Sequence, residues 1–375
     1  MLCRLKPSRM ETRLKDIISG ATSQLRADCA SAELAAYWAR VGRFDDARVR
    51  IASLRKTNER NPQIELSIWL HLSEGLLSYF SEDGVTDSDG VQRAYALSTA
   101  AGIHEMRALS AAWLAQWDYT KINVKDLVFH IQEALSLAGP ENHACRSRAS
   151  LVVAQMLHLA GRFDLAQSWY KVSRDHAIAG FDGATIGALI HNMAWQRMLL
   201  FRQAVLTNKS DISAGRHALL NAESASHFEQ MTGDASWPKL NPILRAQIIS
   251  LGGDAARALP LYIANLSEES IPGRWQANLL ADKAWCHAML NQNDQANSCA
   301  QRALENVAID TQLDDKAATH SRVSQAYYLL GNIQLANYHQ SISQKMWIEF
   351  SAMMLKAVEG LSQLDENGRS KIQAN

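Results

Sequence analysis

Three closely spaced aspartates, Asp83, Asp87 and Asp89, could in principle provide oxygen ligands for calcium. Their spacing does not follow the register of an EF-hand loop, and no glutamate closes the segment. We therefore interpret this segment as a solvated loop in which Asp89 caps the start of the following helix.

Cysteine and histidine are the other residues that could do redox or metal chemistry. The 5 cysteines are odd in number and form no C-x-x-C pair, which is typical of reduced structural thiols. Cys286 and Cys299 lie on the two helices of one predicted hairpin, where they could form a redox pair or pack in the core, and we favour core packing. The 12 histidines are scattered, and none is paired with another possible ligand at a convincing spacing. His158 fits a surface or half-buried position better than a metal ligand.

The sequence signatures of common catalytic sites are absent. The chain contains no G-x-x-x-x-G-K-[ST], G-x-G-x-x-G, H-E-x-x-H or G-x-S-x-G motif. We therefore expect no cofactor, no metal and no enzymatic activity, with an unrecognised enzyme as the remaining alternative. Lysine plus arginine balances aspartate plus glutamate at 38 each, so no net charge attracts nucleic acid or an anionic membrane.

The N-terminal residues give an expectation about location. Five basic residues fall within the first 15 positions, but no apolar run follows that could act as a signal peptide or a membrane span. We expect a cytoplasmic protein without membrane association. Met1 and Met10 are both possible starts.

The elements that would position any site are amphipathic helices. In the segment from Ala149 to Tyr170, apolar residues recur at spacings of three and four on both sides of Gly161. Asp164 and Gln167 resemble a capping box at the start of the second helix. The segment therefore predicts an antiparallel helical hairpin with Phe163 in its turn.

This hairpin recurs along the chain. The segment Gly42-Arg43-Phe44-Asp45 repeats Gly161-Arg162-Phe163-Asp164 letter for letter, and weaker copies of the turn occur at Gly253, at Asn291 and at Gly331. Successive turn positions are separated by 119, 92, 38 and 40 residues, which suits units of roughly 40 residues.

These residues resemble the tetratricopeptide repeat (TPR) family. The matching positions are Leu34, Ala35, Trp38, Gly42, Phe44 and Ala47, and again Val153, Ala154, Leu157, Gly161, Phe163, Ala166 and Tyr170. The units are longer than the family's 34 residues, and its closing proline is mostly absent. The resemblance implies an all-α protein, a right-handed superhelical array of about eight antiparallel hairpins. The C-terminal segment from Ala317 onwards resembles the end of bacterial sensor regions.

We expect four regions: an N-terminal tail and first helix at 1–29, the repeat array at 30–345, a C-terminal capping helix at 346–366 and a disordered tail at 367–375. Within them, a helix is predicted from Glu11 to Ala27, and Pro260 is expected to kink its helix. The final helix carries more apolar residues than one packing face needs, so we predict possible homo-oligomerisation through Met346, Trp347, Phe350, Met353, Met354 and Val358.

In arrays of this family, exposed residues of the first helix of each hairpin line a concave face. Aligning the units on their turns places eight candidates there: Gln155, His158, His191, Trp195, Gln247, Trp285, Gln325 and Tyr328. Aromatic and amide side chains suit an extended peptide or a planar molecule. The leading hypothesis is a protein-binding or peptide-binding adaptor, and the alternative is a small-ligand sensor. Packing between repeats is the competing explanation for Trp195 and Trp285.

Overall fold

The structure is a computed structural model that describes residues 8–81, 88–209, 212–232, 240–266, 273–308 and 311–365. The predicted loop at Asp83 to Asp87 and the predicted tail at 367–375 lie outside these residues. Within them every regular element is an α-helix, so the all-α prediction is confirmed. The 17 helices are α1 (Arg9–Ser19), α2 (Gln24–Arg40), α3 (Phe44–Arg60), α4 (Ile64–Ser81), α5 (Asp89–Ala100), α6 (His104–Lys121), α7 (Val124–Leu137), α8 (His143–Leu159), α9 (Phe163–Ala179), α10 (Gly183–Leu206), α11 (Ile212–Thr232), α12 (Leu240–Leu251), α13 (Ala255–Asn265), α14 (Gly273–Met289), α15 (Asn293–Glu305), α16 (Leu313–Leu329) and α17 (Ile333–Ser362).

The same turn ends several helices. Gly161 has a φ of +77°, and the next amide, on Arg162, donates to the carbonyl of Leu157 at 2.8 Å. Such a left-handed residue satisfies carbonyls at a helix end, and glycine adopts it without strain. The other predicted turn positions, Gly42, Gly253, Asn291 and Gly331, also have positive φ, and Asn291 replaces glycine at a φ of +56°.

Three local predictions are wrong. The helix predicted from Glu11 to Ala27 is two helices, because the chain turns after Gly20 and the Ser23 side chain caps α2 by accepting from the amide of Arg26. The predicted break before Met346 is absent, since neither glycine nor proline occurs in α17 from Ile333 to Glu359, and the helix continues through Met346. The expected boundaries at 29/30 and 345/346 therefore fall inside helices. The capping box at Asp164 does not form, because this side chain pairs with Arg162 instead.

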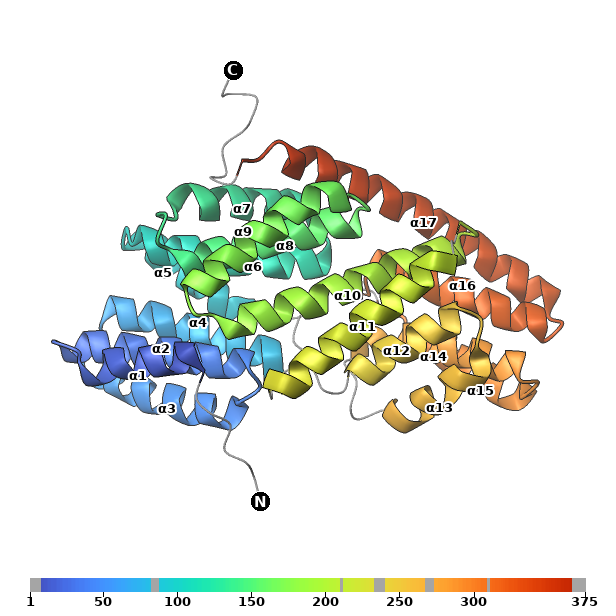
Figure 1. Cartoon of the computed structure of the whole chain (residues 1–375), viewed down its shortest axis with the longest axis horizontal. Coiled ribbons are helices and arrows are strands. Elements are labelled where there is room, and N and C mark those ends of the chain that lie inside the picture. The colour runs from blue at the N-terminus through green and yellow to red at the C-terminus, as the bar shows by residue number, and fades with distance from the viewer. Residues whose placement is uncertain are drawn as a thin grey trace.

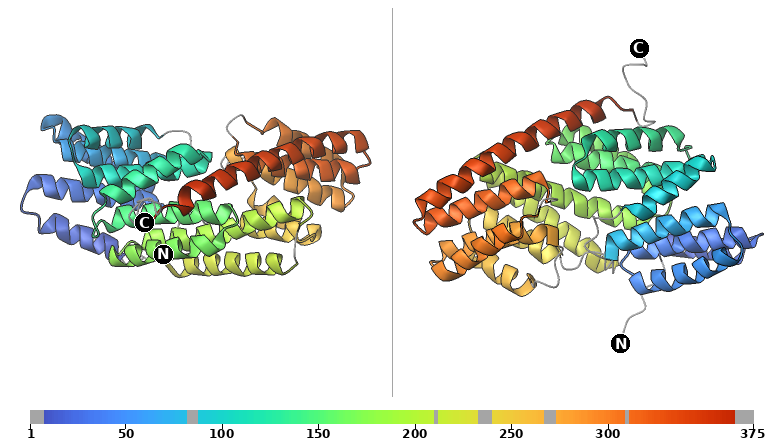
Figure 2. Two further views of the ribbon diagram at one scale, coloured as in Figure 1. Left: turned by 90° about the horizontal axis from the view of Figure 1, so that it is seen from above. Right: turned by 180° about the vertical axis from the view of Figure 1, so that it is seen from behind.

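Helices that follow each other in sequence mostly pack together, and α10 lies at the centre of the molecule in contact with α8, α9, α11, α12 and α16. In a linear repeat array each unit contacts only its neighbours, and the C-terminal end departs from this arrangement. Helix α17 runs back across the molecule and packs against α7 and α8 (Figures 1 and 2). The C-terminal helices thus close onto the N-terminal half.

The apolar face of α17 packs against other helices of the same chain. Trp347, Phe350 and Met354 are buried in the same core as residues of α7 and α8, and Met346, Met353 and Val358 pack against that core. The predicted homo-oligomer rested on these six residues, so the structure removes its basis.

Within the described helices, none combines the length and the apolar character that crossing a bilayer requires.

The four cysteines in the described part of the chain are free thiols. Cys286 and Cys299 are both buried, and they belong to different core clusters. Burial raises the pKa of the Cys286 thiol to about 12, so this group stays protonated at neutral pH. These observations favour core packing over a redox pair.

Candidate functional site

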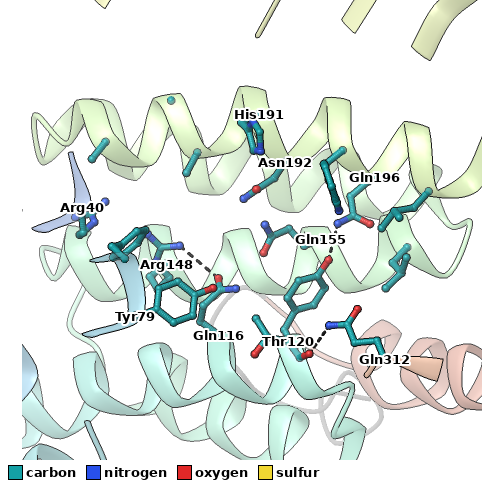
Figure 3. Close-up of a pocket in the computed structure, with 18 of the residues that line it drawn as sticks. Arg40, Tyr79, Gln116, Thr120, Arg148, Gln155, His191, Asn192, Gln196 and Gln312 are labelled. Carbon is teal, nitrogen blue, oxygen red and sulfur yellow. Dashed lines mark hydrogen bonds between the residues drawn. The ribbon is translucent and has the colours of Figure 1, made fainter. Parts of the chain in front are cut away.

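A cavity of about 150 Å³ lies along one face of α10 (Figure 3). Residues from α2, α4, α6 and α8 form one wall, and residues from α14 and the start of α16 close the other end. The cavity therefore lies where the N-terminal and C-terminal halves meet. Its lining is Arg40, Tyr79, Phe80, Gln116, Tyr119, Thr120, Arg148, Gln155, Leu159, Ala184, Gly187, Ala188, His191, Asn192, Trp195, Gln196, Leu199, Trp275 and Gln312.

Helical periodicity explains how α10 lines this space. The positions of α10 that face the cavity recur at spacings of three and four, so they form one stripe. At the N-terminal end of this stripe are Ala184, Gly187 and Ala188, whose small side chains leave room for a ligand. Larger residues, His191, Trp195 and Leu199, follow towards the C-terminal end.

One end of the cavity is aromatic and rich in amides. The ring centroids of Trp195 and Trp275 are 5.3 Å apart, and the imidazole of His191 stacks on Trp195 with an interplanar angle of 19°. Gln196 donates to the hydroxyl of Tyr119, and burial raises the pKa of that hydroxyl. Among the described residues, the side-chain oxygens of Gln155 and Gln196 accept no hydrogen bond. Both oxygens are buried, and the described residues leave their capacity to accept a hydrogen bond unused.

The other end carries two arginines. Arg40 is fixed by Asp182, whose carboxylate lies 2.9 Å from its guanidinium, and it also donates to the hydroxyl of Thr185 at 2.7 Å. Arg148 is 5 % exposed and lies over the ring of Trp113, with 4.0 Å between its guanidinium carbon and the ring centroid. Burial and the charge of Arg40 lower the pKa of Arg148 to about 9.

Three of the eight candidates from the sequence line this cavity: Gln155, His191 and Trp195. They were expected on an exposed face, but Gln155 and His191 are buried because α8 and α10 lie inside the molecule. His158 is also buried, at 2 % exposure, and its Nδ1 lies 3.1 Å from the hydroxyl of Tyr170. The surface position expected for His158 is therefore wrong.

Three further candidates gather elsewhere, around an ion pair between Arg322 and Asp282 at 2.8 Å. Trp285 is buried with its ring 4.4 Å from the Arg322 guanidinium carbon, Gln325 accepts from Arg322 at 2.9 Å, and Gln247 lies 3.5 Å from Asp282. Packing inside the molecule thus accounts for Trp285. The eighth candidate, Tyr328, is 66 % exposed at the end of α16 and does not line the cavity.

A second buried ion network joins α10 to α16. Arg202 donates to Asp314 and to Asp315 at 2.7 Å each, and Asn278 of α14 donates to Asp315 at 3.1 Å. All three charged side chains are less than one tenth exposed. Burial and the neighbouring Asp315 raise the pKa of Asp314.

The arginine end of the site and two histidine pairs were not predicted from the sequence. Arg148 stands in a helix whose residues are almost all buried, and a basic residue in such an apolar segment was the available signal. His143 lies 3.0 Å from His176, and His320 lies 3.0 Å from His339, in each case between the two Nδ1 atoms. Residues so far apart in sequence meet only after hairpins fold. Across the described ranges, no group of three or more His, Cys, Asp or Glu side chains is arranged to hold a metal ion.

Acidification from pH 7 to pH 5 is expected to lower the free energy of unfolding. Burial lowers the pKa of His158, His191 and His320 to about 4, from 6.5. Between these values the unfolded chain binds protons that the folded chain does not, so each histidine contributes a slope of about 1.4 kcal/mol per pH unit. Asp314 opposes them, since its raised pKa lets the folded state bind an extra proton.

Denaturant titrations at several pH values measure this slope. The variant His158→Asn should lower by about one the number of extra protons that the unfolded chain binds. The slope should then fall by about 1.4 kcal/mol per pH unit. The exposed His104→Asn is the matched control and should leave the slope unchanged. A slope that is equal in His158→Asn and in the unmodified protein would contradict the prediction.

Comparisons with known proteins give no identification. No protein-family model matches the chain, and no curated protein matches it.

Proposed function

We propose that this protein is a non-enzymatic regulator that binds one small planar molecule in the cavity along α10. Its architecture is then a TPR-like α-solenoid of antiparallel hairpins, closed by α17. The recurring left-handed turn and the packing of consecutive helices support this architecture. The observation that carries the proposed function is the cavity itself, with aromatic rings and open amide oxygens at one end and Arg148 at the other.

The size of the cavity favours one of the two hypotheses from the sequence. An apolar cavity of about 150 Å³ is large enough for benzene, whereas pockets for drug-sized molecules measure about 300–1,000 Å³. The cavity, at about 150 Å³, therefore suits a ligand with one ring and a small substituent. An extended peptide is too large for it. The small-ligand hypothesis is accordingly preferred to a peptide lying in the concave face.

The chemistry of the lining favours binding over catalysis. The described lining residues include no carboxylate, cysteine or serine, and the hydroxyl of Thr120 donates to the carbonyl of Trp117, so the lining offers His191 as a base but no nucleophile hydrogen-bonded to it. Stacking on Trp195 or Trp275 would hold a ring, and the oxygens of Gln155 and Gln196 would accept from its polar edge. Because these residues come from both halves, a bound ligand would hold the halves together and so report its presence to a partner.

A cavity-filling variant tests the proposal. We expect a screen of small metabolites, read by thermal shift, to give at least one compound that raises the melting temperature of the unmodified protein. In Ala188→Phe the new ring occupies the cavity, and the shift should disappear. The matched control is Ala352→Phe, on an exposed position of α17, where the shift should persist. A compound that stabilises both variants equally would bind elsewhere, and a screen without any hit would refute the proposed function.

A protein-binding role remains a second candidate, supported by one surface. Five large apolar side chains are exposed around the turn between α16 and α17: Tyr328, Leu329, Ile333, Leu335 and Tyr338. Exposed apolar patches of this kind mark sites of protein interaction. In this proposal the protein works in the cytoplasm, without nucleic acid or membrane.

A further inference from the structure

Arg148 differs from the other buried arginines in its partners. Arg40, Arg202 and Arg322 each contact a carboxylate at 2.9 Å or less. Arg146, two residues away on the same helix, donates to the carbonyls of Gly139 and Ala138 at 2.9 and 2.7 Å. Arg40, Arg202 and Arg322 thus each have a carboxylate counterion, and Arg146 has two carbonyl acceptors.

Arg148 has no comparable partner. In the part of the chain that the structure describes, its only hydrogen bond is a 3.4 Å contact to the amide oxygen of Gln116, and its Nε donates to nothing. The ring of Trp113 covers one face of the guanidinium. The nearby carboxylate of Asp182 is held by Arg40 and Thr185. Buried charges are normally paired, so a buried cation on a cavity wall that no described carboxylate neutralises is suited to receive an anion from a ligand.

We propose that Arg148 is the anion receptor of this cavity and that the ligand is a planar ring compound carrying one carboxylate. A guanidinium binds a carboxylate through two parallel hydrogen bonds; the Nε of Arg148 makes no hydrogen bond among the described residues, and its Nη1 makes only the 3.4 Å contact to Gln116. Gln116 lies beside it and can complete the contact (Figure 3). This inference rests on the proposed function, because it names the ligand class of the same cavity.

The charge and the volume of the site both limit the ligand. Arg40 and Asp182 neutralise each other, so the arginine end carries one uncompensated positive charge, which a monoanion balances. A phosphate monoester has more charge and more acceptor atoms than a single guanidinium can satisfy. After the acid group, a cavity of about 150 Å³ leaves room for one ring, which reaches towards Trp195 and Trp275.

The test compares ring acids with their neutral amides on the full-length protein. Benzoate and nicotinate are titrated against benzamide and nicotinamide by calorimetry, with phenyl phosphate as the competing anion. We expect at least one carboxylate to bind about 30-fold or more tightly than its amide, because an unpaired charge remains buried when the amide binds. Tighter binding of phenyl phosphate would overturn the assignment to a carboxylate.

Two variants locate the effect. Arg148→Met should reduce carboxylate affinity about 30-fold or more, while Arg148→Lys should keep part of it. The control Arg174→Met removes an exposed arginine of α9 and should bind like the unmodified protein. Cooperative unfolding of Arg148→Met shows that the variant is folded. Equal carboxylate affinity in Arg148→Met, or equal binding of acids and amides, would overturn the inference.

The outcome also separates this inference from the proposed function. If a neutral metabolite binds in the cavity and is blocked by Ala188→Phe, while no ring carboxylate binds, the assignment to Arg148 is wrong and the proposed function stands. If no compound of either kind binds, both are refuted.

Discussion

Replacing Arg202 with methionine is expected to lower the free energy of unfolding by about 3–5 kcal/mol. The substitution leaves the carboxylates of Asp314 and Asp315 buried beside each other without a cation. The cost arises from these stranded charges, because the methionine side chain still fills most of the space of the arginine stem. Urea denaturation followed by circular dichroism measures the change.

Two further variants show whether stranded charge is the cause. In the triple variant Arg202→Met, Asp314→Asn and Asp315→Asn the charges are removed together, and much of the lost stability should return. Arg48→Met, which breaks an exposed pair with Asp45, should change the free energy of unfolding by less than about 0.5 kcal/mol. A loss of under about 1 kcal/mol in Arg202→Met would contradict the network seen in the structure.

Replacing Arg148 with methionine is expected to raise the free energy of unfolding of the ligand-free protein, by about 1–3 kcal/mol. Burial and the charge of Arg40 lower the pKa of Arg148, so they destabilise its charged form. The contacts of Arg148 with Trp113 and Gln116 do not fully offset this destabilisation. Removing the charge therefore relieves a cost. The same change that weakens ligand binding should stabilise the free protein, which is typical of a residue kept for binding.

Arg146 provides the matched comparison, since it is a buried arginine of the same helix. Arg146→Met deprives the carbonyls of Ala138 and Gly139 of their charged donor and should lower the free energy of unfolding by about 2 kcal/mol. Denaturant titration of both variants without ligand gives the two values. If Arg148→Met destabilises the protein as much as Arg146→Met does, Arg148 is a structural residue and not an anion receptor.

Local sequence signals predicted the helices and the turns well. The spacing of apolar residues around Gly161 and the repeated glycine positions depend on neighbours three to five residues apart, and all five predicted turn positions have positive φ. The helix predicted from Glu11 to Ala27 is wrong although the signals that divide it are also local: Gly20 ends α1, and Ser23 caps the start of α2. The predicted start of a separate helix at Met346 is wrong, because the sequence around Met346 contains no residue that ends a helix.

The candidate site was only partly predictable. Counting back from each turn selected Gln155, His191 and Trp195, which line one cavity, because equivalent positions of repeated hairpins face the same way. The same count also selected Gln247, Trp285 and Gln325, which belong to a different buried cluster. The position of a residue within its repeat predicts which side of the hairpin its side chain faces. It does not predict which distant helix packs against that side.

The sequence by itself therefore determined the helical class, the turns and the absence of common catalytic motifs, because each depends on residues near one another along the chain. Only the tertiary structure decided that α17 returns to α7 and α8 and that the cavity is small. It also decided that Arg40 has Asp182 as its counterion, whereas no carboxylate among the described residues pairs with Arg148. Arg40 and Asp182 are 142 residues apart, so their pairing follows from the packing of whole helices. The physical reason is that charge compensation and cavity volume are properties of side chains brought together from many helices, and no local pattern records them.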